Sequence, residues 1–268
     1  MKVFKYIAFT LFYLLINKVA HSQKEYPFKP GEEVSYIVSY NWGFIWIDVG
    51  EAKFSVKERK IKNMNFLELE GWGKTYSSWD KFFKVRDYYK SIVYPESLKP
   101  VYFLRDIQEG DYKFKITYKF IRRKKLVYAE RKGNTGSHHL DTVKVSDNTY
   151  DLLSIIYYSR TLDFDRLKEN QKVPVSIMLD RKFEKLYFRY IGKEIFKNKK
   201  IGKYKAIKLK VLTVPSLEFK GGETMTIWIT DDKNHIPIWI ESPISVGSVK
   251  VRLKSYKNLK YPLSSKLD

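Results

Sequence analysis

The chain has 268 residues, of which 44% are hydrophobic and 16% aromatic, and its 51 basic residues against 30 acidic ones give a formal charge of +21. This hydrophobic content excludes a disordered polymer, and the length suits one large domain or two small ones. The absence of cysteine excludes disulfides, thiolate metal sites, cysteine nucleophiles and a lipid-anchored N-terminal cysteine.

The first residues predict export. Two lysines precede an uncharged apolar run at residues 6–16, which is short for a bilayer span. The small residues Ala20 and Ser22 then stand where a signal peptidase cuts, so we expect residues 1–22 to be a signal peptide, cleaved between Ser22 and Gln23. The alternative is an uncleaved N-terminal anchor. No later stretch reaches the length of a transmembrane helix, so no stable membrane span is expected after cleavage.

Alternation of apolar and polar residues dominates the rest of the chain and predicts β-strands. Gly71 and Gly73 fall inside one of them and predict a bulge or a sharp bend. Two charged runs, residues 122–125 and 197–205, lie between strands and are interpreted as hairpin turns rather than as a membrane-surface patch. The predicted strands cover residues 34–40, 44–56, 66–76, 85–94, 101–108, 112–122, 125–131, 172–178, 183–196, 204–214, 224–230, 236–241 and 246–256.

One main helix is predicted near the middle of the chain, at residues 149–160. Asn148 followed by Asp151 resembles a capping box, and Asp151 also suits the positive end of the helix dipole. Arg160 suits the opposite end of the dipole or, if the helix fills a half-barrel, a buried strand carboxylate. Leu152, Ile155, Ile156 and Ser159 are expected on one face of this helix, with Leu153 and Tyr157 beside them.

Short turns rather than crossover helices link the predicted strands, so the sheet is expected to be antiparallel. Such a sheet avoids open edges by curling or by folding over a helix. We therefore predict a mainly β fold: a strongly curved antiparallel sheet or half-barrel of about twelve strands with one central helix. No linker or shift in composition divides residues 23–268, which we interpret as a single β-rich domain.

Several short segments occur together along the chain in a fixed order. They are Phe28-Lys29-Pro30-Gly31-Glu32, Phe83-Lys84-Val85-Arg86-Asp87, Leu98-Lys99-Pro100-Val101-Tyr102-Phe103-Leu104-Arg105, Glu109-Gly110, Asp151-Leu152-Leu153-Ser154, Tyr157-Tyr158-Ser159-Arg160, Ile227-Trp228-Ile229-Thr230-Asp231-Asp232, Ile236-Pro237, Gly247-Ser248-Val249 and Leu259-Lys260-Tyr261-Pro262-Leu263. This set resembles the exported bacterial family called domain of unknown function 3108 (DUF3108), over roughly residues 27–263. The resemblance implies a periplasmic or outer-membrane-facing setting and a β-rich, half-barrel-like fold, and it brings no established activity.

The histidines give no firm indication of a metal site. His138, His139 and His235 fall in predicted loops, and neighbouring residues of a strand point to opposite faces. The polar residues 231–235 between two strands lack the glycine and the final glutamate of a calcium loop, so they predict a hairpin turn. We predict no metal-binding and no cofactor-binding residues.

Two pairs of carboxylates are candidates for a glycosidase site, Asp48 with Glu51 and Glu68 with Glu70. Glu68 and Glu70 alternate with apolar residues, which is typical of the solvent side of an ordinary strand. The sequence also lacks the serine-hydrolase and zinc-protease motifs. We therefore predict no catalytic residues and expect a protein that is not an enzyme.

Aromatic residues are the main excess of this composition, and four of the six tryptophans lie in the N-terminal third. Aromatic rings stack on sugars or line cavities for acyl chains, although they also fill ordinary β cores. The ligand-contact candidates are Trp42, Phe44, Trp46, Trp72 and Trp79.

The leading hypothesis is an exported, non-enzymatic binding or carrier protein for an apolar or amphipathic ligand such as a lipid or acyl chain, with lysines near an anionic envelope surface. Nucleic acid is not expected, because no nucleic-acid-binding motif is present. One alternative is a structural or assembly factor that binds an envelope protein or glycan through an exposed aromatic patch. The other is a glycan-acting hydrolase.

Overall fold

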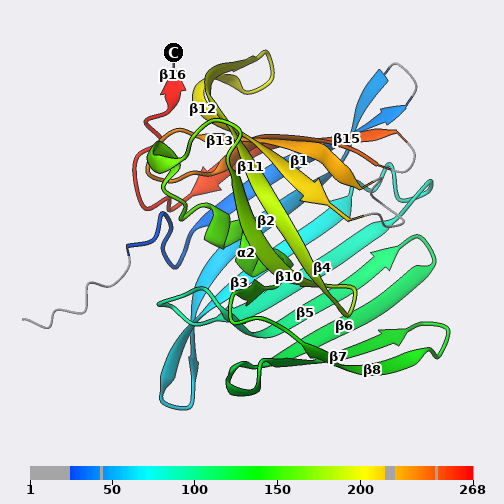
Figure 1. Ribbon diagram of the computed structural model, residues 1–268. Helices are drawn as coiled ribbons and strands as arrows, with labels where there is room; N and C mark the ends of the chain where they lie inside the picture. The colour runs from blue at the N-terminus through cyan, green and yellow to red at the C-terminus, as the bar shows by residue number, and fades with distance from the viewer. Residues whose placement is uncertain (1–24, 43–44, 215–220, 245–246, 268) are drawn as a thin grey trace, which may run out of the picture.

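One β-sheet runs through almost the whole of this protein (Figure 1). The single α-helix of the described part, α2 (Leu152–Ser159), lies against one side of the sheet, and two short 3-10 helices are η1 (Arg122–Lys124) and η2 (Phe164–Arg166). None of the helices in the described part is long and apolar enough to cross a membrane. The computed structural model describes residues 25–42, 45–214, 221–244 and 247–267.

In the described part of the chain, sixteen strands make up the sheet. Most are rich in β-branched and aromatic residues, which favour the extended backbone. They are β1 (Glu33–Trp42), β2 (Ile45–Ile61), β3 (Met64–Thr75), β4 (Val85–Val93), β5 (Pro100–Glu109), β6 (Tyr112–Ile121), β7 (Leu126–Gly133), β8 (His138–Lys144), β9 (Thr149–Tyr150), β10 (Lys172–Leu179), β11 (Lys182–Asn198), β12 (Gly202–Thr213), β13 (Gly222–Thr230), β14 (Pro237–Pro243), β15 (Ser248–Lys257) and β16 (Lys266–Leu267).

Most strands that follow one another in the chain, such as β1 and β2, pair as antiparallel hairpins, because a short turn allows only that direction. Strands β1 and β15 join the two halves of the chain, with Glu33 opposite Lys257, so the blue and orange strands of Figure 1 lie side by side. The only parallel pair among the described strands is β9 with β10. The order across the sheet is β8-β7-β6-β5-β4-β3-β2-β1-β15-β14-β13-β12-β11-β10-β9, with β16 paired to β12.

The prediction of a mainly β, mostly antiparallel fold with one helix is confirmed, but two of its details are wrong. The sheet has sixteen strands rather than about twelve, because β8, β9 and β16 were not predicted. Strand β8 is a polar, mostly exposed edge strand, and β9 and β16 have two residues each, too few to show alternation. The sheet is also not strongly curled or closed, since its end strands β8 and β9 do not pair with each other.

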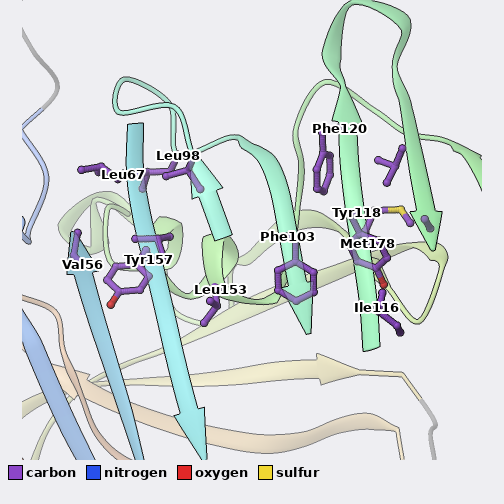
Figure 2. Packing of buried hydrophobic residues seen from close by; sticks show 14 of the residues in the cluster. Val56, Leu67, Leu98, Phe103, Ile116, Tyr118, Phe120, Leu153, Tyr157 and Met178 are labelled. Atoms are coloured by element: carbon purple, nitrogen blue, oxygen red, sulfur yellow. The ribbon is translucent and has the colours of Figure 1, made fainter. Parts of the chain in front are cut away.

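The main hydrophobic core lies between α2 and the strands β3 to β7. Leu153 and Tyr157 of the helix are buried together with Leu69, Phe103 and Tyr118 of the sheet, and Figure 2 shows how several of these side chains gather. Burial of apolar surface of this kind is the main driving force for folding. We call the side of the sheet that carries α2 the inner face, and the opposite side the outer face.

The hairpin of β10 and β11 is fixed to the inner face at its turn. The Arg181 guanidinium lies 2.6 Å from the Asp141 carboxylate of β8, and Arg105 of β5 donates to Asp180 at 3.0 Å. Met178 of β10 belongs to the same core as Leu153. Side chains of the helix and of this hairpin therefore fill the space above the inner face of β3 to β7.

The helix is shorter than the predicted residues 149–160, and its cap differs from the predicted one. Asp151 is the N-cap, and its carboxylate accepts hydrogen bonds from the backbone of Leu153 and Ser154, while the Ser154 hydroxyl accepts one from the Asp151 backbone. The capping box is thus formed by Asp151 with Ser154, and not by Asn148 with Asp151. The helix buries Leu153, Ile155 and Tyr157, whereas Ile156 is exposed.

The two glycines of β3 do not form the predicted bulge. The register of β3 with β2 and with β4 continues without a shift through Gly71 and Gly73. A Cβ atom at Gly71 would lie 3.2 Å from Leu153 and 3.3 Å from Phe54. Gly71 therefore lets the helix approach the sheet closely, which is a packing role that single-strand periodicity does not reveal.

Candidate functional site

Among the aromatic residues predicted to contact a ligand, Trp46, Trp72 and Trp79 have described side chains. Trp46 lies on β2, Trp72 lies on β3, and Trp79 lies in the connection between β3 and β4. The backbone of Trp42 ends β1, but its side chain is outside the described part, and Phe44 lies outside the described residues altogether. The three candidates whose side chains are described therefore lie on three different elements.

Trp46 belongs to an aromatic group over β2, β11, β13, β14 and β15. The Lys250 ammonium stands 4.2 Å above the Trp46 ring and 5.9 Å from that of Trp239, within the range of cation–π attraction. Phe196 packs against both Trp228 and Trp239, with ring centroids 5.2 and 5.7 Å apart. This group was missed because its members come from strands that are distant in the sequence.

Trp72 lies on the outer face, next to Tyr88 of β4 with ring centroids 5.6 Å apart. The Lys57 ammonium is 5.9 Å from the Trp72 ring. Trp72 shares its side of β3 with Glu68 and Glu70, because residues two apart on a strand point the same way.

An open groove of about 320 Å³ lies on the outer face over β2 to β5. Its lining residues are neighbours across the strands, since Glu68 of β3 is opposite Ile92 of β4, and Ile92 is opposite Tyr102 of β5. Two basic side chains and one carboxylate stand among these apolar residues, so the groove is amphipathic. Its lining residues are Arg59, Ile61, Glu68, Lys90, Ile92, Val101, Tyr102 and Leu104.

Glu68 and Glu70 are buried, which corrects the prediction that they face solvent. The long side chains of basic residues on the neighbouring strands cover them, as the stems of lysine and arginine often do. Glu70 pairs with Lys57 and accepts a hydrogen bond of 2.7 Å from the Tyr88 hydroxyl. Burial raises the pKa of the Glu70 carboxyl, but these two partners lower it by more, so the pKa lies below its ordinary value.

Glu68 is held less tightly than Glu70. Its carboxylate oxygens are 3.7 Å from Arg59 and 3.7 Å from Lys90, beyond normal hydrogen-bond distance. One of these oxygens, Oε2, is buried without a hydrogen bond. Because a buried polar atom without a partner costs free energy, this part of the groove favours a ligand that brings polar groups.

Asp151 and Arg160 both have structural roles. Asp151 is fully buried and accepts a hydrogen bond of 2.6 Å from Ser91, and burial raises its pKa to about 6. Arg160 pairs with the buried carboxylate of Glu32, which directly precedes β1, as one of the two interpretations from the sequence expected. Neither side chain is open to a ligand from outside.

Two of the three histidines in the described part of the chain, His138 and His235, contact other groups of the fold. His138 lies 3.0 Å from Glu130, His139 is its neighbour on edge strand β8, and the His235 ring is 2.8 Å from the backbone oxygen of Arg160. In the described part of the chain, no three histidine or acidic residues are grouped so as to hold a metal ion. The predicted hairpin at residues 231–235 is confirmed, since β13 and β14 flank it and pair.

Asp48 and Glu51 are each neutralised by basic residues. Arg252 donates to both oxygens of Asp48 at 2.7 and 2.6 Å, and hydrogen bonds from this guanidinium lower the pKa of Asp48. Glu51 lies between Lys74 and Lys254, whose hydrogen bonds lower its pKa as well. Glycosidic general acids need a raised pKa, whereas the pKa values of Asp48, Glu51 and Glu70 are all lowered.

The groove residues were not found from the sequence, although one pattern pointed to them. Lys90 and Ile92 lie two residues apart on β4, and Tyr102 and Leu104 lie two residues apart on β5, so each pair points to one side of its strand. A register for that hairpin would have placed the two pairs on the same face as Glu68.

The fold and the groove define a β-rich protein with an amphipathic groove on one open sheet. The chain belongs to the family described as "Protein of unknown function (DUF3108)", which matches residues 35–254. A comparison with curated proteins finds no match. A similar solved structure is the "Beta-barrel-like Protein of Domain of Unknown Function DUF1849" from Brucella abortus, with a TM-score of 0.56, 7% identity, and coverage of 87% of this chain and 99% of that chain. At that identity the likeness shows the fold alone.

Proposed function

We propose that this protein is an exported, non-enzymatic binding protein for an amphipathic envelope molecule, such as a lipid or a lipid-derived acyl chain, held in the outer groove. The observation that carries the proposal is the groove itself, in which apolar side chains lie beside Arg59, Lys90 and the incompletely bonded Glu68. Ligand sites typically combine a mostly apolar lining with a few polar groups of this kind.

The filled inner face argues for a site on the outside of the sheet. Leu153 and Tyr157 of α2 and Met178 of β10 are buried in the core above β3 to β7. An acyl chain between the helix and the sheet would have to displace this packing, whereas the outer groove is already open. We therefore place the ligand in the groove and not beneath the helix.

The observations give less support to a hydrolase. Asp151 has a raised pKa, as a general acid would need, but it is buried as the helix cap and hydrogen-bonded to Ser91. The carboxylates of Asp48, Glu51 and Glu70 are paired with basic residues. Binding without catalysis is the simpler use of such a surface.

Native mass spectrometry of residues 23–268, purified gently from the periplasm of the source organism, tests the proposal. A lipid-sized adduct that survives desalting is expected. In titrations with a long-chain fatty acid, Leu104→Asp in the groove should weaken binding by about tenfold, because it removes part of the apolar lining. The matched control is Ile195→Asp, at an exposed position of β11, which should bind like the wild type. Absence of any adduct, or equal binding by both variants, would contradict the proposal.

A further inference from the structure

The connection between β3 and β4, residues 76–84, exposes two large aromatic side chains to solvent. Phe82 is 76% exposed and Phe83 is 56% exposed, among the largest values for apolar residues in the described part of the chain. Single exposed apolar residues are common, but adjacent exposed phenylalanines on one loop form a patch that calls for an explanation.

The loop is held rigidly at its base, so the exposure of these rings is built into the fold. Arg86 donates to both oxygens of Asp80, at 3.0 and 2.5 Å, and the Thr75 hydroxyl donates to Asp80 at 2.6 Å. Hydrogen bonds from Arg86 lower the pKa of Asp80, so this clamp stays ionised near neutral pH. The backbone amides of Phe82 and Phe83 both donate to the Trp79 carbonyl, which closes the tip as a tight turn.

The rings at the tip also support one another. Trp79 and Phe82 have centroids 5.4 Å apart at an angle of 48°, and the Phe83 ring is close enough to Gly110 that a Cβ atom there would lie 3.3 Å from it. The backbone of Gly110 donates to the Lys84 carbonyl at 2.7 Å, which joins the loop to the β5–β6 turn. The patch therefore has a fixed shape before it meets any partner.

Basic residues flank the aromatic tip. Lys81 directly precedes Phe82, Lys84 directly follows Phe83, and both lysines are exposed. At the adjoining β5–β6 turn, Tyr112 is 45% exposed and is followed by the exposed Lys113. Aromatic rings enter the interfacial region of a bilayer while lysine ammonium groups reach back to anionic headgroups.

We propose that the loop of residues 76–84 docks this protein onto an anionic lipid bilayer, with Phe82 and Phe83 inserted at the interface and Lys81 and Lys84 on the headgroups. The charge of the flanking lysines, and of the chain as a whole at +21, is complementary to such a surface. This site is separate from the outer groove, so it does not depend on the proposed ligand.

Sedimentation with vesicles of phosphatidylglycerol and phosphatidylethanolamine, compared with vesicles of phosphatidylcholine alone, tests this docking. Wild-type protein should bind the anionic vesicles, and binding should weaken as salt increases. The double variant Phe82→Ser/Phe83→Ser should reduce the partition coefficient about tenfold or more, because two rings no longer leave water. Both rings are exposed, so this variant is expected to fold normally.

Matched controls separate this loop from general effects of charge and apolarity. Lys81→Glu/Lys84→Glu should reduce binding on the order of tenfold or more. Lys60→Glu/Lys62→Glu, which makes the same change of charge at the opposite end of β3, should have a much smaller effect. Met64→Ser/Leu140→Ser removes two other exposed apolar side chains, of 55% and 72% exposure, and should bind as the wild type does.

The proposal is overturned if the wild type does not bind anionic vesicles, or if the Phe82→Ser/Phe83→Ser variant binds them equally well. Equal binding to phosphatidylcholine vesicles would overturn the role of the lysines. If the Phe82→Ser/Phe83→Ser variant still binds vesicles but no longer binds a purified envelope protein, the loop is instead a protein-binding site.

Discussion

Arg160, after the last turn of α2, forms a buried ion pair with Glu32, which precedes β1 and lies 128 residues earlier in the chain. Nη1 is 2.5 Å from one carboxylate oxygen and Nη2 is 3.0 Å from the other, which is a bidentate arrangement. The same guanidinium donates to the backbone oxygen of Asn234 at 3.1 Å. This one side chain therefore connects the helix, the start of the sheet and the β13–β14 turn.

Removing Arg160 should destabilise the protein strongly. In Arg160→Met, Glu32 would be left as a buried charge without a partner, at an expected cost of about 3–5 kcal/mol in the free energy of unfolding. Urea denaturation followed by circular dichroism measures this change. As a control, Arg166→Met removes an 87% exposed member of an ion pair and should change stability by less than about 0.5 kcal/mol. Equal stabilities of the two variants would show that the buried pair is dispensable.

Asp151 should make stability depend on pH in a direction opposite to that of an ordinary paired carboxylate. Burial raises its pKa from 3.8 to about 6 in the folded state, so between these pH values the folded protein holds a proton that the unfolded chain has lost. Stability from this group is therefore present below pH 4 and is lost as the pH rises to 6. The full effect is at most about 3 kcal/mol.

The Asp151→Asn variant isolates this contribution, because it keeps a capping oxygen but cannot ionise. Unfolding free energies of both proteins should be measured from pH 4 to pH 7. The unfolding free energy of the wild type minus that of the variant should decrease as the pH rises. The contributions of all other carboxylates cancel in this difference. A difference that is constant with pH would mean that Asp151 titrates normally in the fold.

Gly71 and Gly73 should respond differently to the same substitution. Gly71→Ala places a methyl group 3.2 Å from Leu153 and should cost about 1–3 kcal/mol through overpacking. Gly73→Ala places it no closer than 3.8 Å to Asp87, which is ordinary contact, and should be neutral or slightly stabilising. Thermal or urea unfolding of the two variants measures the difference. Similar effects would show that close packing of α2 on β3 is not what requires glycine.

Glu68 should reduce the affinity of the outer groove for anionic amphiphiles. In Glu68→Gln, Arg59 and Lys90 lose the negative charge between them, so a long-chain fatty acid should bind more tightly, on the order of threefold to tenfold at low salt. Glu33→Gln removes an equal charge from a pair with Lys53 outside the groove and should leave affinity unchanged. Isothermal titration calorimetry compares the two. Weaker binding by Glu68→Gln would place the ligand headgroup on the carboxylate instead.

Much of the strand content could be predicted because alternation is a local property. Strand β4 was expected at residues 85–94 and runs from Val85 to Val93, and the turn after β6 lies at the predicted charged run. Edge strand β8 was missed because a strand with little apolar contact on either side has no reason to alternate.

The ligand-contact candidates chosen from the sequence do not line the outer groove, because the groove's members come from different strands. Trp72 was chosen for its aromatic ring, but its neighbour Tyr88 and the groove residue Tyr102 follow from the register of β3, β4 and β5. Glu68 and Glu70 were assigned to solvent because basic side chains that cover them lie on other strands.

The β-rich class, the family, most strand positions and the presence of one central helix followed from the sequence, because each depends on residues close together in the chain. Only the tertiary structure shows that the sheet stays open, that Glu32 forms an ion pair with Arg160, and that an amphipathic groove lies over β2 to β5. These features depend on which strands pair and which side chains cover one another, and such contacts join residues far apart in sequence.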